Sequence, residues 1–450
     1  MNRFTSIGVW LLCLWRINNG IVVNILTIAN WHWLCQRRRT LLEQSEDRAL
    51  SVAVFLAAYQ EAGTIEKCLW GLNSLDRHSV DHFVIYVIGT AREEGDPHSP
   101  GHTFASVDTV INAPDFGVDV QYVLYPWKVG GKAEQLNYAL ELHHTSLEQF
   151  DYVLVVDADV VVSPDLLTIA GKELALRAAE HLEEPVVLQP LVLTTVPESS
   201  NGGYKSGLLV ADAIMTSIWR LGFELTRMRT AHWVAEGGGL VRRIIDLAVY
   251  CVGACMLVDM RYLLQNGFPT PVEDTALGFR LTFLRLPIVP IPSLAFNPNE
   301  TGVGDIIKQS GSWFLSILSI HPELVMYLTG AGSSSFGDRV RAIWLYTKDQ
   351  GRVLDWLPGP FISLLLIAVH LIRGRPRDWT PVRAWLVLLV LHYSSCERVI
   401  SWIRARPCEI YLAGFEYPSV GKVIVGCHTR WIIRSLLPAI YLIRQRLRLL

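Results

Sequence analysis

Residues 151–159 read DYVLVVDAD, an apolar run that ends in two aspartates with one alanine between them. A continuous run rich in valine predicts a strand covered on both faces, as in sheets flanked by helices. Ligands of such sheets bind outside the carboxyl ends of the strands. Asp157 and Asp159 therefore stand where a ligand site is expected, although an aspartate pair can also simply end a strand and begin a turn.

Strands and helices alternate around this run. Strands are predicted at residues 51–59, 82–88 and 120–125, and helices at residues 61–75 and 132–143. This alternation predicts an α/β domain with a largely parallel, Rossmann-like sheet covered on both faces. A chain of 450 residues is long enough to contain such a domain together with membrane-associated segments.

The composition predicts a protein of mixed character. Hydrophobic residues make up 51% and charged residues 18%, too apolar for a typical soluble enzyme and too polar for a transporter made only of membrane helices. No basic motif interleaved with aromatic residues indicates nucleic-acid binding. The eight cysteines form no CxxC pair and no Cys/His metal spacing, so we expect reduced thiols rather than a disulfide framework or a zinc site.

We expect three parts: an N-terminal membrane anchor or interfacial helix at 1–39, an α/β domain at 40–335, and amphipathic and transmembrane helices at 336–450. In the last part, residues 339–348 would lie along the membrane surface. Three apolar stretches, at 353–372, 382–403 and 420–443, approach the ~20 residues that cross a bilayer.

Charges at both ends of the chain bear on its orientation in a membrane. If the first segment spans, the arginines at 37–39 place the following domain in the cytosol. From residue 371 onward there are 13 Lys and Arg against 4 Asp and Glu, which suits anionic lipid headgroups.

Three further segments carry side chains with possible chemistry. Residues 128–132 (KVGGK) enter a helix, where glycines allow a close approach to a ligand and Lys132 can neutralise phosphate, although a solvated lysine is the simpler alternative. Glu273 and Asp274 begin another helix, where acids also serve as caps, but Asp274 could accept a proton from a hydroxyl. Residues 309–313 (QSGSW) offer an amide and an indole, and a buried structural tryptophan is equally compatible.

Six segments, taken in order, resemble the family 2 glycosyltransferases, in particular the membrane-embedded branch with the cellulose, chitin and hyaluronan synthases. The segments are AYQE at 58–61, GKA with LN at 131–137, DAD at 157–159, GAC with GF at 253–268, ED with RL at 273–281, and Q with W at 309 and 313. The resemblance covers roughly residues 50–315 and implies a glycosyltransferase A-type domain.

The resemblance implies an inverting, metal-dependent hexosyltransferase that uses a nucleotide sugar, with a UDP-linked donor as the first expectation. It assigns the catalytic base to Asp274 and the Mg²⁺ or Mn²⁺ ligands to Asp159 and Asp157. It assigns nucleotide-sugar binding to Tyr59, Glu61, Lys132 and Asp157. It assigns the acceptor and diphosphate side to Gly253, Glu273, Gln309 and Trp313.

The sequence departs from the family pattern at several places. Ala58 and Gln60 replace a proline and an asparagine, and Gly89 and Thr90 stand where an aspartate often binds the nucleotide. Ser312 stands where the family has the arginine that helps hold the diphosphate.

These departures favour the transfer of one or a few sugars over polymerisation. The membrane-associated segments predict a lipid-linked or amphiphilic acceptor and an integral membrane protein with a cytosolic catalytic domain. The alternative within the family is a processive polysaccharide synthase. A catalytically silent membrane scaffold and a transporter are alternatives from other classes.

Overall fold

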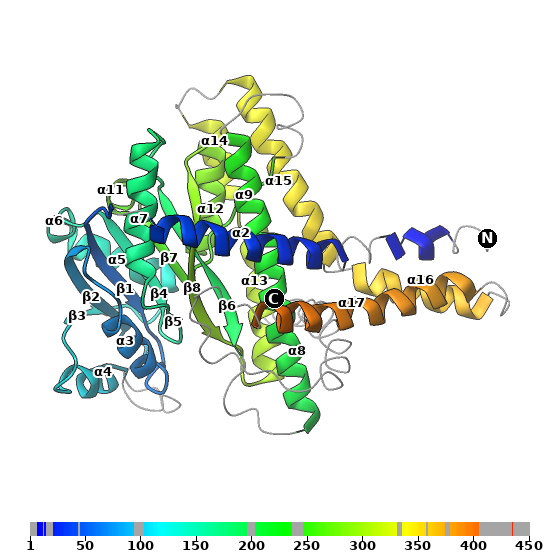
Figure 1. The fold of residues 1–450 in the computed structure, drawn as a ribbon, viewed down its shortest axis with the longest axis horizontal. Helices are drawn as coiled ribbons and strands as arrows, with labels where there is room; N and C mark the ends of the chain where they lie inside the picture. The colour runs from blue at the N-terminus through cyan, green and yellow to red at the C-terminus, as the bar shows by residue number, and fades with distance from the viewer. Residues whose placement is uncertain are drawn as a thin grey trace.

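The computed structural model describes residues 7–11, 13–14, 21–43, 46–93, 103–195, 203–235, 246–330, 335–356, 359–373, 379–404 and 434. Its centre is one eight-stranded sheet with the strand order β3-β2-β1-β4-β7-β6-β8-β5 (Figure 1). The strands are β1 (Leu50–Ala57), β2 (Val80–Thr90), β3 (Asp119–Tyr125), β4 (Tyr152–Asp157), β5 (Val161–Val162), β6 (Val187–Thr195), β7 (Cys255–Asp259) and β8 (Ile288–Pro298).

The first half of the sheet is parallel and the second half is mixed. Strands β3, β2, β1 and β4 run parallel to one another. Strand β7 is antiparallel to both β4 and β6, β6 is parallel to β8, and β5 is antiparallel to β8. The expectation of a largely parallel sheet is therefore correct only for residues 50–157. An apolar run indicates that both faces of a strand are covered, but it does not indicate the direction of the strand.

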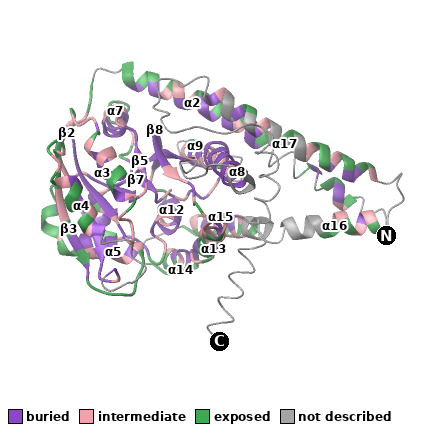
Figure 2. Ribbon diagram, turned by 90° about the horizontal axis from the view of Figure 1, so that it is seen from below, coloured by how far each residue is buried: buried purple, intermediate pink, exposed green. Residues whose placement is uncertain are grey.

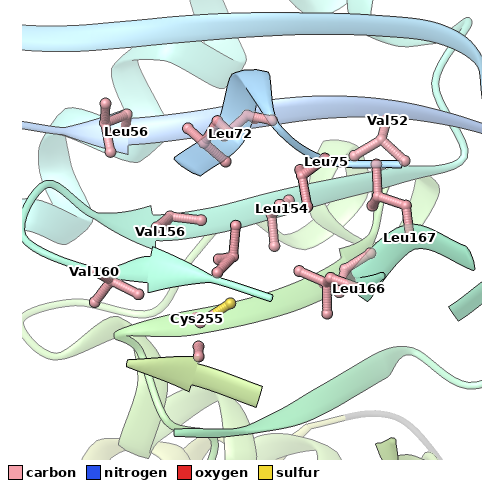
Figure 3. Close-up of a cluster of buried hydrophobic side chains, with 14 of the residues drawn as sticks. Val52, Leu56, Leu72, Leu75, Leu154, Val156, Val160, Leu166, Leu167 and Cys255 are labelled. Atoms are coloured by element: carbon pink, nitrogen blue, oxygen red, sulfur yellow. The ribbon is translucent and has the colours of Figure 1, made fainter. Parts of the chain in front are cut away.

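Helices cover both faces of the parallel half. One face packs against α3 (Ile65–Asn73), α4 (Thr103–Ile111) and α7 (Leu166–Ala179), and the other against α5 (Lys132–Leu142), α6 (His144–Leu147), α11 (Met260–Asn266) and α12 (Glu273–Leu284). Along β4, Leu154 and Val156 belong to the first core and Val153 and Val155 to the second. Figure 3 shows the first core, and Figure 2 shows the buried residues concentrated in the strands and in the helix faces beside them.

The strand that precedes α3 ends earlier than the sequence predicts. Strand β1 ends at Ala57. Gln60 adopts a φ of 61°, so the chain turns before α3 begins at Ile65. Residues 58–64 therefore form a turn at the carboxyl end of β1 instead of the start of a helix.

A second group of helices lies beside the mixed half of the sheet, and part of it contacts β6 or β8 directly. It comprises α2 (Val23–Glu43), α8 (Gly203–Trp219), the π-helix η2 (Arg220–Glu224), α9 (Leu225–Ala235), α13 (Val303–Leu318), α14 (His321–Thr329), α15 (Phe336–Trp356), α16 (Gly359–Arg373) and α17 (Thr380–Arg404). Helix α17 packs along α2, and α16 and α17 extend away from the sheet (Figures 1 and 2).

Helix α2 is fastened to the α/β domain. The Arg37 guanidinium lies 2.6 Å from a Glu173 carboxylate oxygen of α7, and Arg38 pairs with Asp165 at the start of α7. Helix α2 approaches η2 so closely that a Cβ on Gly222 would lie 2.5 Å from Thr27 Oγ1. Two of the three arginines at 37–39 are therefore used to dock this helix on the domain.

The sequence predicts transmembrane helices at both ends of the chain. In the ranges that the structure describes, no helix is both long enough and apolar enough to cross a membrane. The predicted stretch at 420–443 lies outside the described residues except for Arg434.

Most of the described cysteines match the expectation of reduced thiols. Free thiols are present at Cys13, Cys68, Cys251, Cys255 and Cys396, all of them buried. Cys35 of α2 is disulfide-bonded, so the expectation is wrong at this position.

Candidate active site

Lys132 lies at the centre of the candidate site. It is the first residue of α5, directly after Gly130, which has a φ of 111°, and Gly131. Its Nζ lies 2.5 Å from Asp157 Oδ1 and 3.0 Å from Glu273 Oε1. Burial lowers the pKa of Lys132, but the charges of Asp157 and Glu273 outweigh burial and raise it above its ordinary value. The ammonium group is therefore charged and connects the end of β4 to the start of α12.

Asp274 is held rigidly beside this ammonium group. Its Oδ2 accepts a hydrogen bond from Gly253 N at 2.9 Å, and its Oδ1 accepts one from Thr275 N at 2.5 Å. Burial raises the pKa of Asp274 to about 6, with the neighbouring charge of Glu273 acting in the same direction and Lys132 opposing it. The group is thus an aspartate of increased basicity that still ionises near neutral pH.

Gly253 joins the two acidic segments. Its carbonyl oxygen accepts a hydrogen bond from Lys132 Nζ at 2.9 Å, while its N–H donates to Asp274. A Cβ at this position would lie only 2.8 Å from Asp274 Oδ2, so the close approach requires glycine. Five predicted site residues are brought together by these contacts: Lys132, Asp157, Gly253, Glu273 and Asp274.

A group of carboxylates surrounds the other side of Asp157. Burial, together with the charges of Asp157, Glu61 and Glu300, raises the pKa of Asp159 to about 7. Burial also raises the pKa of Glu61, with added effects from Asp157 and Glu93. Glu300, just beyond β8, also belongs to this group and was not predicted from the sequence. Its position directly after a strand is the local signal that could have indicated it.

These oxygens fit a divalent cation that shares its coordination with a substrate. The carboxylates repel one another, and a cation would remove that repulsion. Among the described residues, no three His, Cys, Asp or Glu side chains form a complete metal-binding group. Mg²⁺ and Mn²⁺ prefer oxygen ligands, and Mg²⁺ commonly retains waters and substrate phosphates, so two aspartates are a sufficient protein contribution.

Tyr59, in the turn after β1, contacts Arg92, which the sequence did not single out. The Arg92 Cζ lies 5.0 Å from the centroid of the Tyr59 ring. Arg92 Nε also donates to Lys128 O at 3.0 Å and its Nη2 to Gly130 O at 2.8 Å. Arg92 therefore links the turn after β1 to the glycine loop that precedes Lys132.

Glu93 follows Gly89 and Thr90, where the family often carries an aspartate. Its carboxylate accepts hydrogen bonds from Gln60 N and from the Thr103 N–H and hydroxyl, the latter at 2.6 Å. The side chain is 7% exposed, so it serves to fix the turn after β1 to the start of α4.

Gln309 and Trp313 of α13 form a separate wall. Gln309 Nε2 donates to Glu300 Oε1 at 3.0 Å, which connects this wall to the carboxylate group. Arg434 Nη1 donates to Gln309 Oε1 at 2.9 Å, and the Arg434 Cζ lies 4.6 Å from the centroid of the Trp313 ring. Ser312 is exposed. Sequence reasoning missed Arg434 because it is distant in the chain from both residues that it contacts.

Sequence comparison finds no matching protein-family model and no matching curated protein. Comparison with solved structures finds a mannosyltransferase from Pyrobaculum calidifontis in complex with GDP-Man and Mn²⁺, 13% identical, covering 96% of this chain and 99% of the other, with a TM-score of 0.47. TarS 1–349 from S. aureus in complex with UDP-GlcNAc is 12% identical, covering 86% and 90%, with a TM-score of 0.37. Mannosyl-3-phosphoglycerate synthase from Rubrobacter xylanophilus is 15% identical, covering 68% and 81%, with a TM-score of 0.30.

Proposed function

We propose that this protein is a metal-dependent, inverting glycosyltransferase that transfers a sugar from a nucleotide sugar to an acceptor hydroxyl. One observation carries the proposal. A fixed carboxylate of raised pKa, Asp274, is joined through Gly253 and Lys132 to Asp157 at the carboxyl end of β4. This arrangement places a candidate base next to a candidate site for a cation and a diphosphate.

The donor would bind along the edge formed by β1, β4 and α5. Tyr59, Glu61 and Asp157 would position the nucleoside, and Lys132 would add positive charge near the diphosphate. Asp159 and Asp157 would hold Mg²⁺ or Mn²⁺, which when bound supplies a Lewis acid for the charge on the leaving diphosphate. A UDP-linked sugar is the first donor to test.

Asp274 would act on the acceptor. Its carboxylate would take the proton of an acceptor hydroxyl while that oxygen bonds to the anomeric carbon, on the side opposite the leaving group. The bond between the anomeric carbon and the diphosphate oxygen would break, and its electron pair would leave on that oxygen. Attack from the opposite side inverts the configuration of the anomeric carbon. A pKa near 6 suits this role, because the group is ionised at neutral pH and is a stronger base than an ordinary aspartate.

The acceptor would bind between Gly253, Glu273 and the wall formed by Gln309 and Trp313. We further propose that it is lipid-linked or amphiphilic, and that the protein is bound to a membrane with residues 40–335 as a cytosolic catalytic domain. Helix α15 supports this part of the proposal, because Phe336, Ile343 and Trp344 expose 84%, 47% and 48% of their surface. Large exposed apolar side chains on an amphipathic helix suit a bilayer surface.

The experiment is a donor screen with the purified full chain, Mn²⁺ and a membrane lipid extract, with release of nucleoside diphosphate and labelled product as readouts. Asp274→Asn should lower the rate by about 10²–10⁴-fold with the preferred donor, since it removes the base. Asp259→Asn is the matched control, because Asp259 is also an aspartate bonded to a backbone N–H, from Tyr262 at 2.6 Å, at the start of α11. Failure of every donor, or a normal rate for Asp274→Asn, would refute the proposal.

A further inference from the structure

A second group of charged side chains lies beside the candidate active site and has no role in the proposed proton transfer. A small hollow next to α13 is lined by Arg220, Arg434, Gln309, Trp313, Asn299 and Thr216. Arg220 also lines an adjoining hollow together with Gln189 and Val252, and Val252 directly precedes Gly253. Arg220 therefore lies between the loop that holds Asp274 and the Trp313 wall.

The Arg220 guanidinium is buried without a carboxylate in contact. The residue is 8% exposed, and its Nη1 donates to Val192 O at 3.1 Å. No carboxylate in the described part of the chain lies within ion-pair distance of it, although Glu224 attracts it from one turn further along η2. Glu224 itself accepts a hydrogen bond from the Tyr250 hydroxyl at 3.1 Å. A buried cation without a contact partner is costly unless an anion joins it.

Arg434 places a second guanidinium in the same hollow and is rigidly oriented. It is 3% exposed, and its Nε and Nη2 lie 2.8 Å and 2.5 Å from the two carboxylate oxygens of Asp212. Its Nη1 donates to Gln309 Oε1 and to Ser310 Oγ, each at 2.9 Å. Burial lowers the pKa of Arg220, and the like charge of Arg434 lowers it further against the opposing effect of Glu224. Asp212 balances the charge of Arg434, whereas Arg220 has no carboxylate in direct contact among the described residues.

We propose that Arg220 and Arg434 form a binding site for a phosphate group beside the candidate active site. The Arg220 guanidinium presents planar, forked donors that match phosphate oxygens, and it keeps its charge when buried. Arg434 already donates from Nε, Nη1 and Nη2 to Asp212, Gln309 and Ser310, so Arg220 is the main phosphate donor. The hollow is small, and it is walled by Trp313 and by the polar side chains of Asn299 and Thr216. The identification of the molecule that carries the phosphate rests on the proposed function. The phosphate belongs either to the diphosphate of the donor or to the acceptor.

The test measures the binding of inorganic phosphate to the full chain through its effect on thermal unfolding. We expect phosphate to raise the Tm of the wild type, and Arg220→Gln to weaken phosphate binding by about 10-fold or more. The matched control is Arg227→Gln, since Arg227 is 3% exposed and pairs with Asp349 at 2.8 Å but lines neither hollow. That control should bind phosphate as the wild type does.

Absence of a phosphate effect on the wild type, or equal binding by Arg220→Gln, would overturn the proposal. If Arg220→Gln does not fold, Arg220→Lys decides, because lysine keeps the charge and loses the forked donors. Phosphate binding weakened about threefold or more in that variant supports the site, and unchanged binding overturns it.

Two further ligands identify the carrier. Weaker binding of UDP with Mn²⁺ to Arg220→Gln assigns the phosphate to the donor. Unchanged UDP binding with weaker binding of farnesyl phosphate assigns it to a lipid acceptor, and no change with either ligand refutes both carriers. A wild type that binds phosphate through Arg220 and neither binds UDP nor releases nucleoside diphosphate would retain the site and refute the glycosyltransferase proposal.

Discussion

Gly253→Ala is the substitution that most directly tests the link between the two acidic segments. The new Cβ would lie 2.8 Å from Asp274 Oδ2, 2.9 Å from its Cβ and 3.0 Å from its Cγ. All three distances are shorter than ordinary carbon contacts of about 3.5–4.0 Å, so the carboxylate and the loop must separate by roughly 0.5–1 Å. A base that is misplaced by about 1 Å can lose ~10² in rate, while overpacking costs about 1–3 kcal/mol of stability.

We therefore expect kcat to fall by about 10²-fold, with a much smaller change in the KM for the nucleotide sugar, because the donor is proposed to bind on the Asp157 side. Release of nucleoside diphosphate gives both constants, and thermal unfolding measures the loss of stability. Gly351→Ala of α15 is the control, since among the described atoms outside its own stretch of helix none lies within 4 Å of its added Cβ. It should stabilise the helix by up to about 1 kcal/mol. A normal kcat for Gly253→Ala would show that Asp274 is not the base.

Three other predictions follow from the geometry. The kcat/KM should fall about tenfold for each pH unit below about 6, because the carboxylate is the active form of Asp274 and its pKa is raised to about 6; a rate independent of pH between 4.5 and 7 would contradict this. Lys132→Met should move this acid-side fall in kcat/KM to higher pH, because the Lys132 charge lowers the pKa of Asp274. It should also lower the free energy of unfolding by roughly 1–3 kcal/mol in denaturant, since Asp157 and Glu273 lose their cation. An unshifted pH profile would argue against an interaction between Lys132 and Asp274. Gly222→Ala should lower the stability by about 1–3 kcal/mol and increase proteolysis of α2, because its Cβ would lie 2.5 Å from Thr27 Oγ1; an unchanged Tm would mean that α2 is not docked on η2.

Much of the first half of the sheet could be predicted because its signals are local. The apolar run at 151–156 is strand β4, and the predicted helix at 132–143 is α5, which begins at Lys132. The aspartates at 157 and 159 lie at the carboxyl end of β4, as expected for a ligand site. The position of Gly253 next to Asp274 could be suggested only through the resemblance, since no local pattern connects the two residues.

By itself, the sequence determined the buried strands of the first half of the sheet and the acids that follow them, because periodicity and burial are set by neighbouring residues. Only the tertiary structure decided the antiparallel direction of β7, the docking of α2 through Arg37 and Arg38, and the placement of Arg92 on Tyr59. It also decided that Arg434 supplies the guanidinium beside Gln309 and Trp313. These contacts join residues far apart in the chain, so they depend on the path of the connecting segments and on packing, which a local pattern does not contain.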